Sequence, residues 1–113
     1  AIVYNGKIVG KVSINAINVA NKTAQIGYML DKKYEGRGIM TRAVKAMIDI
    51  AMFEYDVHKV EIWAAEGNEK SRAIAERLGF VQEGIIRNAE WLYDHYVNHV
   101  VYGVLRSEWL ART

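Results

Sequence analysis

The stretch DKKYEGRGIMTRAV, from Asp31 to Val44, decides the fold because it joins two segments with different hydrophobic periods. Before it, residues 23–30 alternate between apolar side chains and polar or small ones, which predicts a half-buried β-strand. After it, residues 39–55 carry an apolar stripe at helical spacing, which predicts an amphipathic helix. Gly36 and Gly38 lie between the two segments. The sequence therefore predicts a strand, a glycine-containing loop and a helix in succession.

The glycine loop has two interpretations. Glycine adopts positive φ at little cost, so a simple change of chain direction would explain Gly36 and Gly38. The loop also enters a helix whose first N–H groups lack partners and whose dipole adds about half a positive charge, which suits an anion. Lys33 and Arg37 would add positive charge at the rim. A dinucleotide fingerprint needs glycine where Thr41 stands, and a P-loop needs Gly-Lys-Ser/Thr, so neither motif is present.

Signals on both sides of this loop predict a crossover flanked by hairpins. Asn5-Gly6, between β-rich runs at residues 1–4 and 7–15, is a hairpin signal. Residues 58–65 read as a buried strand, so the helix over 39–55 would connect two parallel strands.

The second half of the chain predicts a helix and two more strands. Asn68 is a good N-cap and Gly79 a good C-terminal stop for a helix from about Glu69 to Leu78. Residues 80–92 and 95–105 then read as strands, followed by a short helical tail. The expected fold class is α/β (α+β), with a mixed, mainly antiparallel sheet and helices packed on it.

Composition limits the classes of protein. A chain of 113 residues predicts one domain over residues 1–113. It contains no cysteine, which excludes a disulfide scaffold, a thiolate metal site and a cysteine nucleophile. No apolar run approaches the roughly 18 residues of a membrane span and no signal peptide is evident, so a cytoplasmic protein without a membrane partner is expected. A net charge of +2 tolerates an anionic ligand but does not predict direct nucleic-acid binding.

Two separated motifs resemble the signatures of one enzyme family. KKYEGRG, after IGYML and before a long helix, resembles the acetyl-coenzyme A loop of the GNAT N-acetyltransferase superfamily, with Lys33 where the family usually has Gln or Arg. NEKSRAIAERLGFVQEG, from Asn68 to Gly84, resembles the second signature. The NxxS and LGFxxEG patterns and the run VVYGVLRSEW are similar to the RimJ/RimL-like branch, which acts on protein N-terminal amines.

The resemblance covers nearly the whole chain and implies the GNAT fold with acetyl-CoA as cosubstrate. The family usually has an amino-terminal strand and two helices that form one wall of the acceptor groove, and this chain lacks them. The chain also opens without an initiator Met. We therefore expect an amino-terminally incomplete acetyl-CoA-binding domain.

The resemblance also implies where the coenzyme binds. Backbone groups of Met29 and Leu30 would hold the pantetheine arm, and the Met29 N–H would polarise the acetyl carbonyl. Their side chains are expected to be ordinary strand and core residues. The implied cofactor-binding set is Met29, Leu30, Lys33, Gly36, Arg37, Gly38, Ile39, Asn68 and Ser71. Capping of the second helix would by itself also explain Asn68.

Ser71 and Glu90 are the catalytic candidates. Ser71 lies on the inward stripe of the second helix, where it could simply bond back to its own helix. Many family members carry a tyrosine at the position of Ala75 that protonates the thiolate, and the resemblance implies that Ser71 is the donor here. Glu90 is the first candidate for the general base, with Glu83 and Asp94 as alternatives.

These predictions leave the acceptor open. The main hypothesis is direct transfer to a primary amine in a ternary complex, with a protein N-terminus, by resemblance that of a ribosomal protein, as partner. The alternatives are a small-molecule acetyltransferase for polyamines or aminoglycosides and a non-catalytic CoA-binding module. A homo-oligomer is left open. His95 and His99 are four residues apart, but on a predicted strand without a third ligand or an HExxH glutamate, so no metal is expected.

Overall fold

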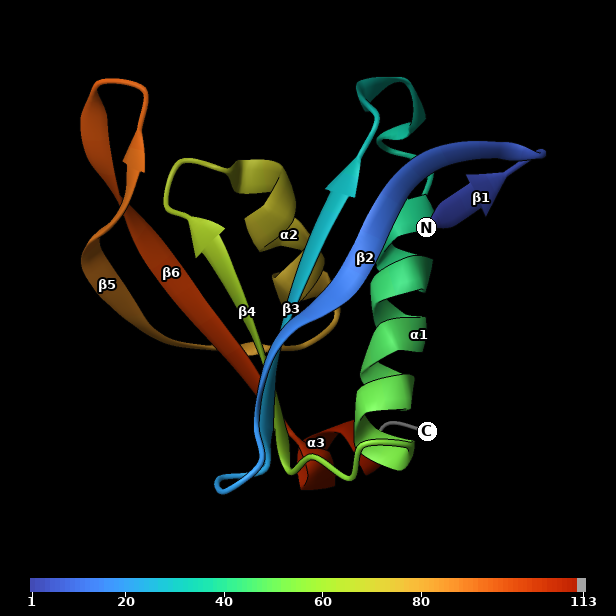
Figure 1. Ribbon diagram of the computed structural model, residues 1–113, viewed down its shortest axis with the longest axis vertical. Helices are drawn as coiled ribbons and strands as arrows, with labels where there is room; N and C mark the ends of the chain where they lie inside the picture. The colour runs from blue at the N-terminus through green and yellow to red at the C-terminus, as the bar shows by residue number, and fades with distance from the viewer. Residues whose placement is uncertain (112–113) are drawn as a thin grey trace.

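The structure is a computed structural model that describes residues 1–111. Within these residues six strands form one sheet in the order β1-β2-β3-β4-β6-β5 (Figure 1). Of the described strand pairs only β3–β4 is parallel, which confirms the mixed, mainly antiparallel sheet. In chain order the elements are β1 (Ile2–Tyr4), β2 (Lys7–Asn18), β3 (Thr23–Leu30), a 3-10 helix η1 (Lys32–Tyr34), α1 (Ile39–Phe53), β4 (Lys59–Ala65), α2 (Glu69–Arg77), β5 (Val81–Leu92), β6 (His95–Leu105) and α3 (Arg106–Leu110).

The crossover from β3 through α1 to β4 confirms the predicted central β-α-β unit. The register joins residues 23–26 of β3 to residues 59–62 of β4 and stops there. Beyond this point the two strands diverge in a V, as Figure 1 shows for the arrowheads of β3 and β4. Among the described strands, the edge of β3 from Gly27 to Leu30 therefore has no partner on the β4 side, and the sheet opens next to the loop that precedes α1.

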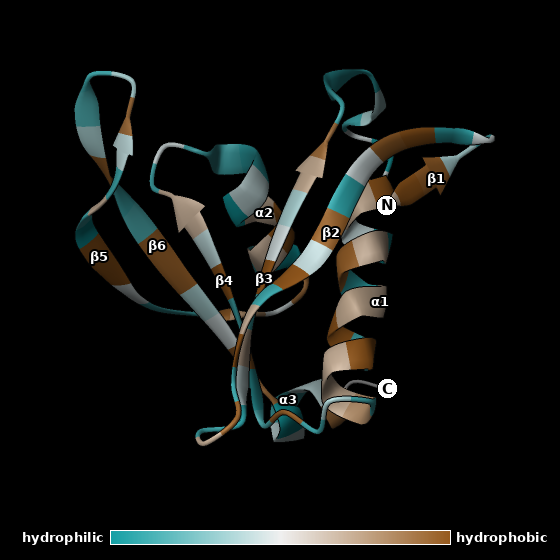
Figure 2. Ribbon diagram, viewed as in Figure 1, coloured by the Kyte–Doolittle hydropathy of each residue, from teal (hydrophilic) through white to brown (hydrophobic). Residues whose placement is uncertain are grey.

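The helices α1 and α2 pack on one face of the sheet. The predicted stripe of α1 is buried there, with Val44, Ile48 and Ala51 fully inaccessible, and Figure 2 shows apolar residues along this helix. Ile26 of β3 and Ile62 of β4 belong to the same core. Burial of this stripe against the central strands provides the main stabilisation of the fold.

Some predicted boundaries move by a few residues. The helix predicted to reach Tyr55 ends at Phe53, because Asp56 takes a left-handed conformation (φ 54°) and the Val57 N–H donates to the Ala51 carbonyl (3.3 Å). This bond folds the chain back over the end of α1. The strand predicted for residues 7–15 continues to Asn18, which pairs with Thr23 of β3.

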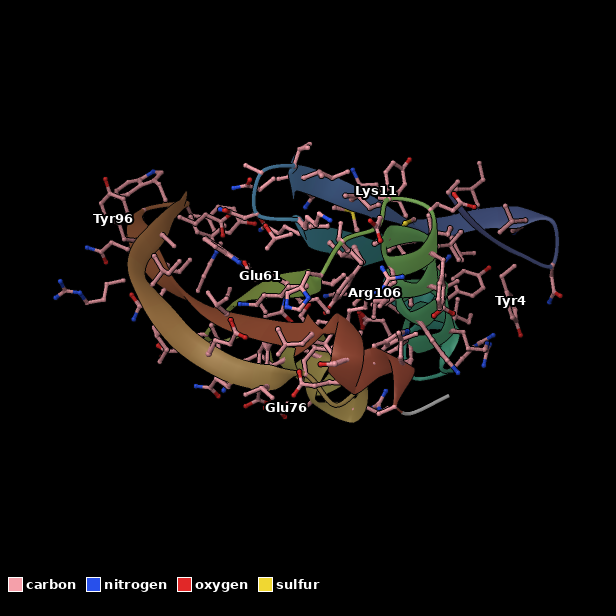
Figure 3. All side chains as sticks on the ribbon, turned by 90° about the horizontal axis from the view of Figure 1, so that it is seen from below. Tyr4, Lys11, Glu61, Glu76, Tyr96 and Arg106 are labelled. Atoms are coloured by element: carbon pink, nitrogen blue, oxygen red, sulfur yellow. The ribbon has the colours of Figure 1, made fainter. Side chains whose placement is uncertain are left out.

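The opposite face of the sheet carries polar side chains. Along β4, Val60, Ile62 and Ala64 are buried, while Glu61 and Trp63 alternate with them and are only partly buried. Figure 3 shows Glu61 and Glu76 on opposite sides of the sheet, with Glu76 on α2. None of the helices between residues 1 and 111 has the length and apolar character of a membrane span.

Candidate functional site

A cleft of about 840 Å³ lies beside the opening between β3 and β4. Its walls are the end of β3, the loop of residues 31–38, the start of α1, and α2. Most of the residues predicted to contact the coenzyme line it: Met29, Leu30, Gly36, Gly38, Ile39, Asn68 and Ser71. Two motifs that are separate in the sequence thus meet around one cavity.

The glycine loop enters α1 in a left-handed conformation. Gly36 has φ 79° and Gly38, the N-cap of α1, has φ 73°, values that disfavour residues with a Cβ. No side chain in the described structure caps this helix end, and the first helical bond runs from the Arg42 N–H to the Gly38 carbonyl (3.1 Å). The N–H groups of the first turn therefore remain available to an anion in the cleft.

The two predicted rim cations lie outside the set of residues that line the cleft. The backbone N–H of Lys33 donates to the carboxylate of Asp31 (3.1 Å), which starts η1. The guanidinium of Arg37 lies 5.4 Å from the ring centroid of Tyr34, and Tyr34 itself lines the cleft. Arg37 thus borders the site through an aromatic side chain.

Cations that the sequence reasoning did not select line the cleft instead: Lys32, Lys70 and Arg77. The Arg77 guanidinium donates to the hydroxyl of Thr41 in the first turn of α1 (3.1 Å). Lys70 forms an ion pair with Glu35 of the loop, which joins α2 to the opposite wall. The positive charge around the cleft therefore comes from both walls and suits a ligand with several phosphates.

Two hydrogen bonds to the backbone of Ser71 hold this residue at the cleft. The side chain of Asn68 accepts a hydrogen bond from the Ser71 N–H (3.2 Å), which confirms Asn68 as the N-cap of α2. The hydroxyl of Tyr28 donates to the Ser71 carbonyl (2.9 Å), so β3 and α2 are tied together. Ala75, one turn further along α2, is fully buried. Position 75 carries no hydroxyl, so Ser71 is the hydroxyl residue that α2 contributes to the lining of the cleft, next to Tyr28 of β3.

Tyr28 is a donor in this site. Burial raises the pKa of its phenol from 10.0 to about 12, because the charged phenolate would lose its hydration. A phenol with this pKa keeps its proton beside a thiol whose ordinary pKa is near 8.5. Tyr28 is therefore assigned to the positioning of α2.

The raised pKa of Tyr28 predicts a loss of stability at high pH. The phenol is protonated in both the folded and the unfolded chain below pH 10, and between pH 10 and about 12 only the unfolded chain ionises. Between about pH 9 and about pH 11.5 we expect the free energy of unfolding of the wild type to fall by about 2 kcal/mol more than that of Tyr28→Phe. Urea unfolding of both proteins at about pH 9 and about pH 11.5 measures the difference. Equal losses in the two proteins would contradict the assignment.

Met29 lies at the sheet opening, but its side chain is not part of the core. The prediction that it packs in the core is wrong, because Tyr28 and Leu30 face the helices and Met29 points to the other side, where it is 65% exposed. Leu30 packs against the core as predicted. The register pairs Met29 with Lys11, and the Asp31 N–H donates to the Val9 carbonyl (2.7 Å), so the backbone groups of Met29 face β2. Those of Tyr28 and Leu30 face the edge of β3 that β4 has left, which is where an extended ligand could add as a strand.

Glu90 belongs to a cluster on the helix-free face of the sheet. Its Oε1 lies 3.1 Å from Nε2 of His99, and the His99 ring packs edge-to-face against Trp63 (centroids 6.3 Å apart). Trp63 is the first residue of β4 beyond the segment paired with β3. The structure therefore places Ser71 and Glu90 on opposite faces of the sheet, with Trp63 linking the Glu90 cluster to the opening.

The alternative bases are engaged elsewhere. Glu83 is bonded to Lys59, and this hydrogen bond raises the pKa of Lys59 above its ordinary value. Asp94 lies at the β5–β6 turn, 89% exposed, and contacts His95 (2.8 Å). His95 and His99 thus contact different carboxylates, and residues 1–111 contain no group of three or more side chains that could hold a metal ion.

Sequence reasoning missed several residues of the site. Tyr28 read as an ordinary member of the strand alternation, and Lys70 and Arg77 were not selected. Lys70 and Arg77 are seven residues apart, so the helical period places them on one face of α2, which was the available signal. His99 was weighed only as a metal ligand.

Comparisons with known proteins agree with this geometry. Residues 1–81 match the family model described as an acetyltransferase (GNAT) domain. The chain is 39% identical over 96% of its length to the putative ribosomal N-acetyltransferase YdaF of Bacillus subtilis (strain 168), and 37% identical over 80% to the ribosomal-protein-serine acetyltransferase of Escherichia coli (strain K12). It covers 59% and 50% of these two proteins.

A solved structure shares the fold. The microcin C7 self-immunity acetyltransferase MccE, in complex with acetyl-CoA and AMP, superimposes with a TM-score of 0.82 and is 38% identical. The match covers 90% of this chain and 57% of that one. The sheet that opens beside the uncapped start of α1 is thus an architecture shared with an acetyltransferase solved with acetyl-CoA bound. With the family model matched over most of the chain, this protein belongs to the GNAT acetyltransferase family.

Proposed function

We propose that this protein is an acetyl-CoA-dependent N-acetyltransferase that acts on the N-terminal α-amine of a protein. The observation that carries the proposal is the cleft between the uncapped end of α1, the unpaired edge of β3 and Ser71 on α2. The left-handed Gly36 and Gly38 leave the backbone of this end open, so the residues fit a pyrophosphate-containing coenzyme. Lys32, Lys70 and Arg77 supply compensating charge.

The chain supplies binding, polarisation and proton transfer. Acetyl-CoA brings a thioester whose thiol, with an ordinary pKa near 8.5, is a tolerable leaving group. Leu30, whose backbone groups face the opening, holds the pantetheine arm like an added strand, and a backbone N–H on this edge polarises the acetyl carbonyl. Ser71 donates a hydrogen bond to the departing sulfur. Glu90 accepts the proton of the attacking amine from the other side of the sheet, directly or through one water.

An α-amine is the proposed acceptor because a weak base can deprotonate it. Its ordinary pKa is near 8, compared with about 10.4 for lysine, so a carboxylate deprotonates it more easily at neutral pH. The relative from Escherichia coli is named for acetylation of serine on a ribosomal protein, which supports a ribosomal protein as partner and the cytoplasm as its place of action. The chain has no cysteine to carry an acyl group, so we propose direct transfer in a ternary complex.

Free thiol release tests this function. The purified protein is mixed with acetyl-CoA and peptides that begin with serine, alanine or another residue, beside N-terminally blocked lysine peptides, spermidine and an aminoglycoside. We expect thiol release with free N-termini, serine first. Release only with spermidine or the aminoglycoside would make it a small-molecule acetyltransferase. Calorimetric binding of CoA without release for any amine would instead identify a CoA-binding module.

Ser71→Ala is expected to lower kcat about tenfold, while the Kd for CoA stays within about twofold of the wild type. A serine is a weak acid, so its loss falls at the lower end of acid–base effects. Steady-state kinetics and calorimetry separate the two quantities. Ser107→Ala on α3 is the matched control, since Ser107 is exposed and lies outside the cleft. A wild-type kcat in Ser71→Ala would remove the serine from the mechanism.

A further inference from the structure

The helix-free face of the sheet holds one hydrogen-bonded group that the proposed function uses only in part. It consists of Trp63 on β4, Glu90 on β5 and His99 on β6, on the side marked by Glu61 in Figure 3. His99 lies next to Trp63 because the register pairs Trp63 with Val101 and Ala65 with His99. The side chain of His99 is 20% exposed, whereas that of Glu90 is 48% exposed. The imidazole is therefore the fixed member of the pair.

The contacts of His99 define its tautomer. A carboxylate can only accept, so the hydrogen shared at 3.1 Å belongs to Nε2 of His99. In the neutral imidazole Nδ1 is then the acceptor, and this atom is buried without a hydrogen-bond partner among residues 1–111. An unpaired buried acceptor is unfavourable, so hydrogen bonding at Nδ1 does not explain the orientation of the ring. Within the described part of the chain, the hydrogen bond that the ring makes is the bond to Glu90.

Glu90 needs such a partner because of its place on β5. This strand is an edge strand, exposed over nearly its whole length, and its register with β6 is irregular between Ile86 and Glu90. A half-exposed carboxylate at an irregular edge would otherwise sample several rotamers. The bond from His99 occupies Oε1 and leaves Oε2 without a protein hydrogen bond among residues 1–111. Oε2 is the oxygen available to an amine.

We propose that His99 is a positioning residue, held by Trp63, that fixes the Glu90 carboxylate toward the acceptor amine. This inference rests on the proposed function, because it assigns His99 a role through the proposed base. His99 itself takes no proton from the substrate. It keeps Nε2–H bonded to Oε1 while Oε2 accepts the proton of the amine, so the carboxylate becomes a neutral acid and no further group changes its proton count.

Two variants separate the hydrogen bond from the shape of the ring. His99→Gln carries an amide N–H near the position of Nε2, and His99→Asn carries one near the position of Nδ1, out of reach of Glu90. We expect H99N to lower kcat about tenfold with the KM for acetyl-CoA unchanged, and H99Q to keep kcat within about threefold of the wild type. Both changes are polar, so folding effects should be similar. Equal kcat in H99N, H99Q and the wild type would overturn the inference.

A double-mutant cycle tests whether His99 acts through Glu90. In a Glu90→Gln background, H99N is expected to change kcat by less than about twofold, because the base is already absent. The same tenfold loss in both backgrounds would mean that His99 has a separate structural role, which would contradict the inference. His95→Gln is the matched control, because His95 contacts Asp94 through Nδ1 in a similar but exposed pair and a glutamine amide does not reproduce Nδ1; its kcat should be unchanged.

Different results would overturn the proposed function and the inference about His99. Wild-type protein that binds CoA but releases no thiol with any amine overturns the proposed function, and with it this inference. Wild-type protein that is active, with H99N as active as H99Q, overturns the inference alone. A loss in His95→Gln equal to that in H99N would transfer the role of base to Asp94 and would also overturn it.

Discussion

Glu90→Gln is expected to lower kcat about 100-fold, with the Kd for CoA within about twofold of the wild type. Glutamine has the size of glutamate and can still accept a hydrogen bond from His99 at its carbonyl oxygen, so only the ability to take a proton is lost. Loss of a general base usually costs at least two orders of magnitude. Steady-state kinetics with the preferred peptide measures kcat, and calorimetry measures the Kd.

The pH dependence and two controls make this prediction specific. The acidic limb of the pH–rate profile reports the free enzyme's base, so we expect it to shift in Glu90→Gln. Glu83→Gln and Asp94→Asn are the controls, because Glu83 is engaged by Lys59 and Asp94 by His95. Their kcat should stay within about threefold of the wild type. A larger loss in either control than in Glu90→Gln would identify that carboxylate as the base.

Alanine at both Gly36 and Gly38 is expected to weaken CoA binding about 100-fold. Each glycine is left-handed, and an L-residue with a Cβ pays about 1–2 kcal/mol to adopt that conformation. The free variant can relax by leaving it, but the bound loop must return to it, so the two costs appear as about 2–4 kcal/mol of lost affinity. Calorimetric titration with CoA measures the change.

Gly6→Ala is the matched control for the glycine pair. Gly6 has a similar φ of 80° and lies in the β1–β2 turn, where a Cβ would meet open space, as it would at Gly36. The variant should lose a similar amount of stability per substitution but bind CoA with the wild-type Kd. If Gly36→Ala/Gly38→Ala keeps the wild-type affinity while its stability falls, the glycines serve the turn alone and not the coenzyme.

The fold was largely predictable because its signals are local. The alternation before residue 31, the helical stripe after residue 38 and the Asn5-Gly6 turn all act within a few residues, and each produced the expected element. Boundaries were less predictable. The end of α1 depends on Asp56 in a left-handed conformation, which has no strong signal in the sequence. The 3-10 turn at residues 32–34 was likewise absent from the sequence prediction.

The candidate site was predictable where contacts run through the backbone. Gly36, Gly38, Asn68 and Ser71 were selected from motifs and line one cleft in the structure. The cations were harder, because Lys33 and Lys32 are neighbours in the sequence and only the η1 turn decides which of them borders the cleft. A loop that reverses direction within a few residues gives the sequence no periodicity from which to read side-chain orientation.

The sequence by itself determined the order of the elements and the glycine-containing entry to α1, since both follow from residue type and short spacing, and two of its motifs were enough to indicate the family by resemblance. Only the tertiary structure decided that β3 and β4 part after residue 26, that Tyr28 ties α2 to β3, and that His99 meets Glu90. These contacts depend on strand register and on the irregularity between Ile86 and Glu90. A shift of one residue in register would send each side chain to the other face of the sheet.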